Sequence, residues 1–86
     1  MPQEVYEGSK RLNFTATTTA LSTGNLLGIL VASSTAGTIR ITDLDGVIVN
    51  TMAVMSATFY RIPCSFRGGM TITVTGTLDA TVFYRL

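Results

Sequence analysis

The sequence predicts an all-β domain, a small antiparallel β-sandwich or jelly-roll of about seven to eight short strands. From Met70 to Thr75, apolar residues alternate with threonines. This period of two is typical of a strand with one face on a core and the other on solvent. The same alternation recurs in residues 12–19, 37–42 and 80–85. Turn residues separate the stretches at intervals of about 8–12 residues, which favours a sandwich or a barrel.

Residues 1–11 differ from the rest, and we interpret them as an N-terminal arm that precedes a single domain, residues 12–86. The arm holds four charged residues, and its only sizeable apolar side chains are Val5 and Tyr6. An arm of this composition is ordered only where a neighbour holds it. The alternative is a frayed terminus without a role.

The first half of the domain is expected to contain two strands and a loop. Residues 12–16 alternate and form the first strand, and a turn cluster follows at residues 21–25. Residues 26–32 are apolar on both faces, as in a strand covered on two sides by a second layer or by a neighbouring subunit. Small residues at 33–37 predict a loop.

A β-hairpin is expected around Asp43–Gly46, between an alternating strand at residues 38–42 and the β-prone residues 47–49. Glycine accepts a positive φ and aspartate bonds to nearby backbone, so Asp-Gly between two such runs is a strong hairpin signal. Residues 50–56 fit either a strand or one helical turn.

The second half continues with a strand at residues 58–62 that Pro63 is expected to end, because proline lacks a ladder donor. Glycines turn the chain into the Met70 strand, and a four-residue hairpin loop is expected at residues 76–79. The inward positions of these strands predict a core of Phe14, Ile29, Ile39, Ile41, Phe59, Ile72, Val74 and Val82.

The composition favours association. The 86 residues are 47% apolar and only 13% charged, against a usual charged fraction of about 25%. A small monomer with so few charges has low solubility, so we expect part of its apolar surface to be buried in a homo-oligomer. The alternative is a monomer whose threonines and serines supply the polarity.

Charge and hydropathy also bound the partners. The net charge is +1, and the arginines are scattered along the chain, so we expect no nucleic-acid partner. No apolar run approaches the ~18 residues of a membrane span. A single cysteine and a polar, acidic start indicate production in a reducing cytoplasm rather than secretion.

Residues for catalysis or cofactor binding are scarce, so we expect neither an enzyme nor a cofactor. The chain has no histidine, the commonest general base and metal ligand. Asp43 and Asp45 resemble part of a calcium loop, but the remaining acids of such a loop are missing, which favours a simple turn. Cys64 has no histidine to activate it and is interpreted as a buried small hydrophobe.

The paired aromatics Phe59-Tyr60 and Phe83-Tyr84 should each place one ring inward and one outward on a strand. Outward rings could form a stacking platform for sugars or bases. The favoured interpretation is a tyrosine that lies at a subunit interface or shields a sheet edge.

Three stretches resemble a known class of proteins: Ala36–Asp43 (AGTIRITD), Ser65–Thr77 (SFRGGMTITVTGT) and the ending Ala80–Tyr84 (ATVFY). Their alternation of residues and the placement of their turns are similar to those of small virion proteins of tailed bacteriophages, particularly capsid decoration (cement) proteins. The resemblance extends over residues 12–86. It implies a small β-sandwich or jelly-roll that assembles as a trimer on the outer surface of the head, at three-fold positions, and has no catalytic residues.

The resemblance and the composition together predict a structural virion protein that decorates and stabilises a bacteriophage capsid. Its partners would be further copies of itself, which we expect to form a trimer, and the major capsid protein. An extended arm would grip the shell through Val5, Tyr6, Lys10 and Arg11. The subunit interface would contain Leu26, Leu27, Leu30, Tyr60 and Tyr84.

Two other functions stay open. One is a host-surface, glycan-binding module of a phage head or tail fibre, in which outward Tyr60 or Tyr84 stacks on sugar. The other is an accessory domain of an enzyme or a small hydrolase, which the lack of histidine and the scattered acids disfavour.

Overall fold

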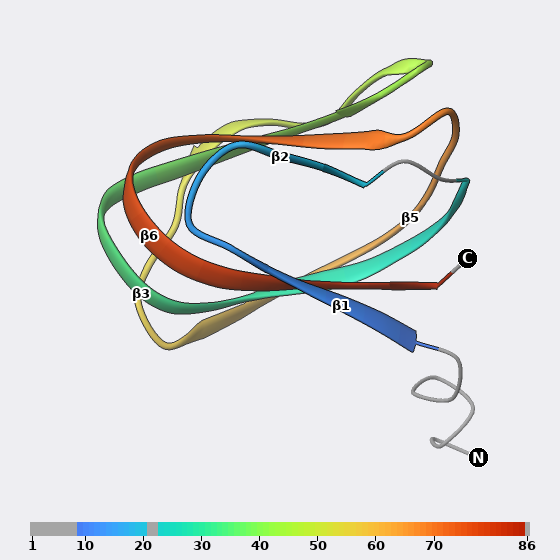
Figure 1. Ribbon diagram of the computed structural model, residues 1–86. Helices are drawn as coiled ribbons and strands as arrows, with labels where there is room; N and C mark the ends of the chain where they lie inside the picture. Colours follow the sequence, from blue (N-terminus) through green and yellow to red (C-terminus); the bar gives the residue numbers. More distant parts are fainter. Residues whose placement is uncertain (1–8, 21–22, 86) are drawn as a thin grey trace.

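The computed structural model describes residues 9–20 and 23–85, which form six β-strands and no helix (Figure 1). The strands are β1 (Ser9–Phe14), β2 (Thr18–Ala20), β3 (Gly24–Asp43), β4 (Gly46–Ala53), β5 (Thr58–Phe66) and β6 (Met70–Arg85). All pairings are antiparallel and join the strands into a single open sheet. The all-β, antiparallel prediction is confirmed. Among the described residues there is no helix that could cross a membrane.

The order of strands in the sheet is β1–β6–β3–β4, with β2 also beside β6 and β5 also beside β3. The two central strands are long, 20 residues in β3 and 16 in β6, and pair along most of their length. Figure 1 shows both of them curving so that one half of the sheet lies over the other. The first half contains β1, β5, residues 24–34 of β3 and residues 78–85 of β6. The second half contains β2, β4 and the other halves of β3 and β6.

The sheet bends where β3 and β6 depart from regular pairing. The register shifts between Val31 and Ser33 and again between Thr35 and Thr38, and bulges of this kind increase local twist. Ala36 and Gly76 both have positive φ, 54° and 81°. A Cβ atom on Gly76 would overlap the carbonyl oxygen of Ala36, so only glycine allows the two strands to approach this closely.

The loops expected at residues 33–37 and 76–79 are therefore wrong, because both segments lie within strands. Their small residues and glycines serve a bend in a continuous ladder instead of a turn. In β6 the buried residues keep the same even spacing on both sides of the bend, with Ile72 before it and Leu78, Ala80 and Val82 after it, whereas residues 75–77 at the bend are exposed. Six strands, two of them long, replace the seven to eight short ones that were expected.

One hydrophobic cluster fills the space between the two halves. Of the expected core, six residues are buried: Phe14, Ile29, Ile39, Ile41, Ile72 and Val82. Val74 is half-buried and packs against the cluster. Phe59 was wrongly assigned to the core, since 52% of it is exposed. Its neighbour Tyr60 packs against the core in its place, and the Tyr60 hydroxyl accepts a hydrogen bond from the backbone N–H of Met55 at 2.9 Å.

The expected hairpin is confirmed: Asp43 pairs with Gly46, and β4 follows directly. Asp43 Oδ1 accepts a hydrogen bond from the Asp45 N–H at 2.9 Å, and Gly46 has a φ of 131°. Pro63 does not end its strand, because β5 continues to Phe66. β5 lies at an edge of its half of the sheet, and Pro63 falls at the register shift opposite residues 26–28 of β3, both of which are positions where a strand tolerates proline.

The first strand begins earlier than the expected end of the arm at residue 11. β1 begins at Ser9 and pairs with β6, so Lys10 and Arg11 belong to the sheet and not to an extended arm. The other two residues of the proposed arm, Val5 and Tyr6, lie outside the described residues.

Candidate functional site

The outward side of the first half of the sheet carries a row of arginine and phenylalanine side chains. Paired residues of an antiparallel ladder point to the same face. Phe83 of β6 pairs with Arg11 of β1 on one side and with Gly28 of β3 on the other. Gly28 in turn pairs with Arg61 of β5. One row across four strands therefore reads Arg11, Phe83, Gly28 and Arg61.

The adjacent row adds Leu30, which pairs with Phe59 on one side and Thr81 on the other. Leu30 is 42% exposed, and the ring of Phe59 meets that of Phe83 edge-to-face, with centroids 6.4 Å apart. Gly28 makes room for this contact, because a Cβ there would lie 2.6 Å from Cζ of Phe59. We call the outward surface formed by Arg11, Gly28, Leu30, Phe59, Arg61, Phe83 and Arg85 the aromatic–arginine face.

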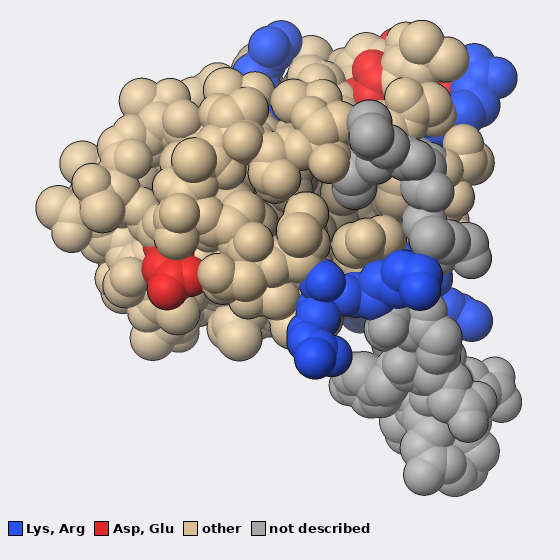
Figure 2. All heavy atoms as spheres, in the orientation of Figure 1, with Lys and Arg blue, Asp and Glu red and all other residues tan. Residues whose placement is uncertain are grey.

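Positive charge gathers at one end of this face. Arg11, Arg61 and Arg85 are all exposed. Figure 2 shows Lys and Arg side chains clustered beside the start of β1 and the end of β6, with acidic side chains elsewhere on the view. Asp79 lies at the opposite end, near the bend, where it accepts a hydrogen bond from Asn13 Nδ2 at 2.9 Å. The face therefore has an apolar centre, with Arg11 and Arg61 at the two flanks of the Phe83 row, Arg85 at the end of β6 and Asp79 toward the bend.

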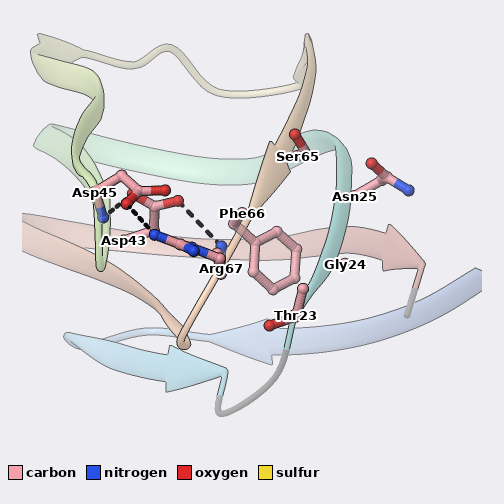
Figure 3. A pocket seen from close by; sticks show the side chains of 8 residues that line it. All are labelled: Thr23, Gly24, Asn25, Asp43, Asp45, Ser65, Phe66 and Arg67. Atoms are coloured by element: carbon pink, nitrogen blue, oxygen red, sulfur yellow. Dashed lines mark hydrogen bonds and ion pairs between the residues drawn. The ribbon is translucent and has the colours of Figure 1, made fainter.

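A second feature is a shallow hollow of about 480 Å³ where β3 begins, β5 ends and the β3–β4 turn approaches. Figure 3 labels its eight lining residues, which come from β3 and Thr23 just before it, the β3–β4 turn, the end of β5 and Arg67 after it. Asn25 and Ser65 present exposed polar side chains, whereas Phe66 is 1% exposed. The hollow can offer hydrogen bonds to a ligand but no open aromatic surface.

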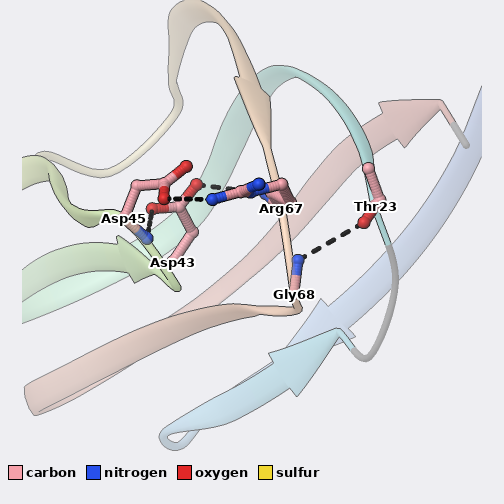
Figure 4. A network of polar contacts seen from close by, with 5 residues as sticks. All are labelled: Thr23, Asp43, Asp45, Arg67 and Gly68. Atoms are coloured by element: carbon pink, nitrogen blue, oxygen red, sulfur yellow. Dashed lines mark hydrogen bonds and ion pairs between the residues drawn. The ribbon is translucent and has the colours of Figure 1, made fainter.

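The charged groups of the hollow are engaged with one another (Figure 4). Arg67 Nη2 donates to Asp45 Oδ1 at 2.7 Å, and the Arg67 N–H donates to Asp43 Oδ2 at 3.1 Å. The hydrogen bond to Asp45 raises the pKa of Arg67 above its usual value. The Gly68 N–H donates to Thr23 Oγ1 at 3.3 Å, which ties the start of β3 to the same corner. The aspartates thus hold a turn and a neighbouring loop together.

The residues predicted for a subunit interface differ in how exposed they are. Leu30 is exposed and Leu27 is half-buried. Leu26 is only 1% exposed and belongs to the core, because a bulge between Leu26 and Gly28 turns it inward together with Ile29. Placing Leu26 at the interface was therefore wrong.

The two tyrosines of the predicted interface also turn toward the core. Tyr60 and Tyr84 are partly buried against the hydrophobic cluster, and Tyr84 meets Phe66 edge-to-face at 6.2 Å. Their assignment as outward rings was wrong, and Phe59 and Phe83 are the outward members of the pairs. Cys64 is exposed, contrary to the buried position expected from its neighbours.

The sequence did not reveal the aromatic–arginine face, because its residues lie on four strands that are far apart in the chain. Only the register of β1, β6, β3 and β5 brings them into adjacent rows. The signal that could have found the face is the spacing of two between Phe59 and Arg61 and between Phe83 and Arg85, which puts an arginine on the same side of each strand as a phenylalanine.

Compared with protein-family models, with curated proteins and with solved structures, the chain matches none of them.

Proposed function

We propose that the protein is a structural virion protein that decorates and stabilises a bacteriophage capsid. In this proposal it is made in the host cytoplasm, forms a homotrimer, and binds the major capsid protein on the outer surface of the head, with no enzymatic activity and no cofactor. Two observations support the proposal: the order of pairing in the two halves of the bent sheet, and the edge of β4, which carries no charge.

That order is consistent with a jelly-roll. With β3 and β6 each counted as two halves, the first half of the sheet reads β1–β6–β3–β5 and the second reads β2–β6–β3–β4. We take this order as support for an eight-stranded jelly-roll, a fold that is common in viral capsid proteins and in lectins. Fold alone does not give function, so the surfaces must distinguish these two classes.

The edge of β4 is the surface that best fits a contact between subunits. This strand has eight residues, none of them charged and none a proline. Exposed Val47 lies in it, and exposed Leu44 and Met55 flank its two ends. Natural sheets protect their edges with charges or prolines, as Lys10 and Arg11 do in β1 and Pro63 does in β5. An edge without such protection suits a contact with a different surface of the next copy, as a closed three-fold ring requires, and it replaces the inward-turned tyrosines in the trimer contact.

The alternative, a glycan-binding module, is favoured by one observation, the polar hollow beside Asn25 and Ser65. Sugar sites usually add an open aromatic ring for stacking. Phe66 in the hollow is buried, and Tyr60 and Tyr84 face the core. The capsid proposal therefore takes precedence, and a glycan screen tests the alternative.

The experiment that tests the proposal combines a mass measurement with particle stability. Light scattering of the purified protein at micromolar concentration should give the mass of a trimer. Particles stripped of the protein should release their contents at a lower temperature than native particles, and adding it back should restore them, because a ligand of the assembled state alone shifts the equilibrium toward that state. A monomer whose removal leaves particle stability unchanged would contradict the proposal.

A further inference from the structure

We infer that the aromatic–arginine face is the surface that docks on the capsid, and that it binds an acidic protein surface with an apolar centre. This inference rests on the proposed function, and it names which side of the molecule meets the shell and what chemistry it meets there.

The apolar centre of the face has the make-up of a protein contact. Phe59 and Leu30 are 52% and 42% exposed, and Phe83 lies beside them in the same two rows. Aromatic residues and arginine are enriched in the energetically dominant parts of protein interfaces. Phe59 and Phe83 also hold each other edge-to-face, so little ordering is needed when a partner covers them.

The charged end of the face calls for carboxylates. In the described ranges, the only ion pair joins Arg67 to Asp45, at the other end of β5 from Phe59. Arg11, Arg61 and Arg85 are exposed on the face itself, and the acid that shares its outward side, Asp79, is bonded to Asn13 near the bend. Guanidinium groups bind carboxylates through paired hydrogen bonds. The partner that complements this face is therefore acidic opposite the arginines.

The same charges argue against the face as the contact between copies of this chain. Each contact of a trimer joins two different patches, so the arginines would need carboxylates on the neighbouring copy. Among the described residues, Asp43 and Asp45 are already bonded to Arg67, and Asp79 is bonded to Asn13. The charge-free edge of β4 has no such requirement. In this inference the edge of β4 contacts other copies of the chain, and the aromatic–arginine face contacts the shell.

A nucleic acid fits the face less well than a protein. Single-stranded nucleic acids need rings with open faces and a groove of cations along the backbone. Here Leu30 stands between the strands that carry the two rings, the rings meet edge-to-face, and the net charge of the chain is only +1.

The test measures how the full-length protein and two charge-reversed variants re-occupy stripped particles. Arg61→Glu changes the face. Arg40→Glu is the matched control, because Arg40 is an exposed arginine of β3 on the other side of the bend, paired with Thr73. We expect Arg61→Glu to weaken particle binding by about tenfold or more, and Arg40→Glu to change it less than about twofold. Raising the salt concentration should weaken binding of the unaltered protein as well.

The outcomes separate the two proposals. If the unaltered protein re-occupies particles and Arg61→Glu does so equally well, the face is wrong and the proposed function stands. If the unaltered protein does not bind at any concentration, the proposed function fails. Loss of the trimer mass in Arg61→Glu would make the face a subunit contact, and tight binding of a single-stranded DNA oligomer that Arg61→Glu abolishes would make it a nucleic-acid site. Either result overturns the inference. Thermal melts of both variants confirm that each is folded.

Discussion

At Phe59 and Tyr60, the register of β5 on β3 determines which of two neighbouring rings is covered, because Tyr60 pairs with the buried Ile29 and Phe59 with the exposed Leu30. The alternation of a strand shows that one ring faces inward and the other outward, but it does not say which. Tyr60 can turn inward because its hydroxyl reaches the N–H of Met55, so its ring packs while its polar tip is satisfied. The contact depends on the turn between β4 and β5, and no pattern within the strand reports it.

The inward and outward sides can be tested by truncating one residue on each. Ile72→Ala should lower the free energy of unfolding by roughly 2–5 kcal/mol, because Ile72 is buried in the core. Phe59→Ala removes an exposed ring and one aromatic contact, so the expected loss is about 1 kcal/mol. Urea unfolding of both variants measures the difference. Equal losses would show that the two side chains share one environment.

Substitutions at two glycines with positive φ distinguish the free-energy cost of backbone strain from the cost of steric overlap. Gly46→Ala should destabilise the fold by about 1 kcal/mol through strain alone, because nothing lies within 4 Å of a Cβ built there. Gly76→Ala meets the same strain and also the carbonyl of Ala36, so a loss of about 3 kcal/mol is expected. Thermal melting of the two variants compares them. A Gly76→Ala protein as stable as Gly46→Ala would place the bend elsewhere.

At the scale of elements, the sequence predicted the alternating strands and the Asp-Gly hairpin, but it wrongly placed loops at two other positions. The stretches around residues 38–42 and 70–75 are strands with the expected inward residues, and the Asp-Gly hairpin is present. Residues 33–37 and 76–79 carry the same glycine and small-residue chemistry as a turn, yet they continue a ladder. Turn chemistry and bend chemistry are alike in sequence, because both need positive φ and small side chains. What separates them is the pairing of β3 with β6, a contact between distant segments.

The edge of β4 gives a prediction at this scale. Val47→Lys places a charge on the exposed edge strand, and burying that unpaired charge in a subunit contact should shift the trimer toward monomers at micromolar concentration. Thr75→Lys is the matched control, because Thr75 is also exposed but lies in the central strand β6. Sedimentation velocity measures both. A trimer that persists in Val47→Lys, or is lost equally in Thr75→Lys, would remove β4 from the contact.

At the scale of the whole molecule, the arginines that are scattered along the sequence are brought together by the fold. The six cations look dispersed along the sequence, but Arg11, Arg61 and Arg85 share one outward face once the strands pair. The sequence could therefore predict that the surface is poor in charge, but it could not predict where the charges gather. The sequence does not reveal the register in which the four strands pair. A shift of one residue in that register would turn each of these side chains toward the core.

The central claim is that the protein covers a viral shell, and the most direct measurement is its copy number in purified particles by quantitative mass spectrometry. A protein that fills three-fold positions over a whole icosahedral surface should be present on the order of hundreds of copies per particle. A component of a fibre or tail would be present in a few tens of copies or fewer. The first result supports a capsid decoration protein, and the second, or absence from the particle, would contradict it.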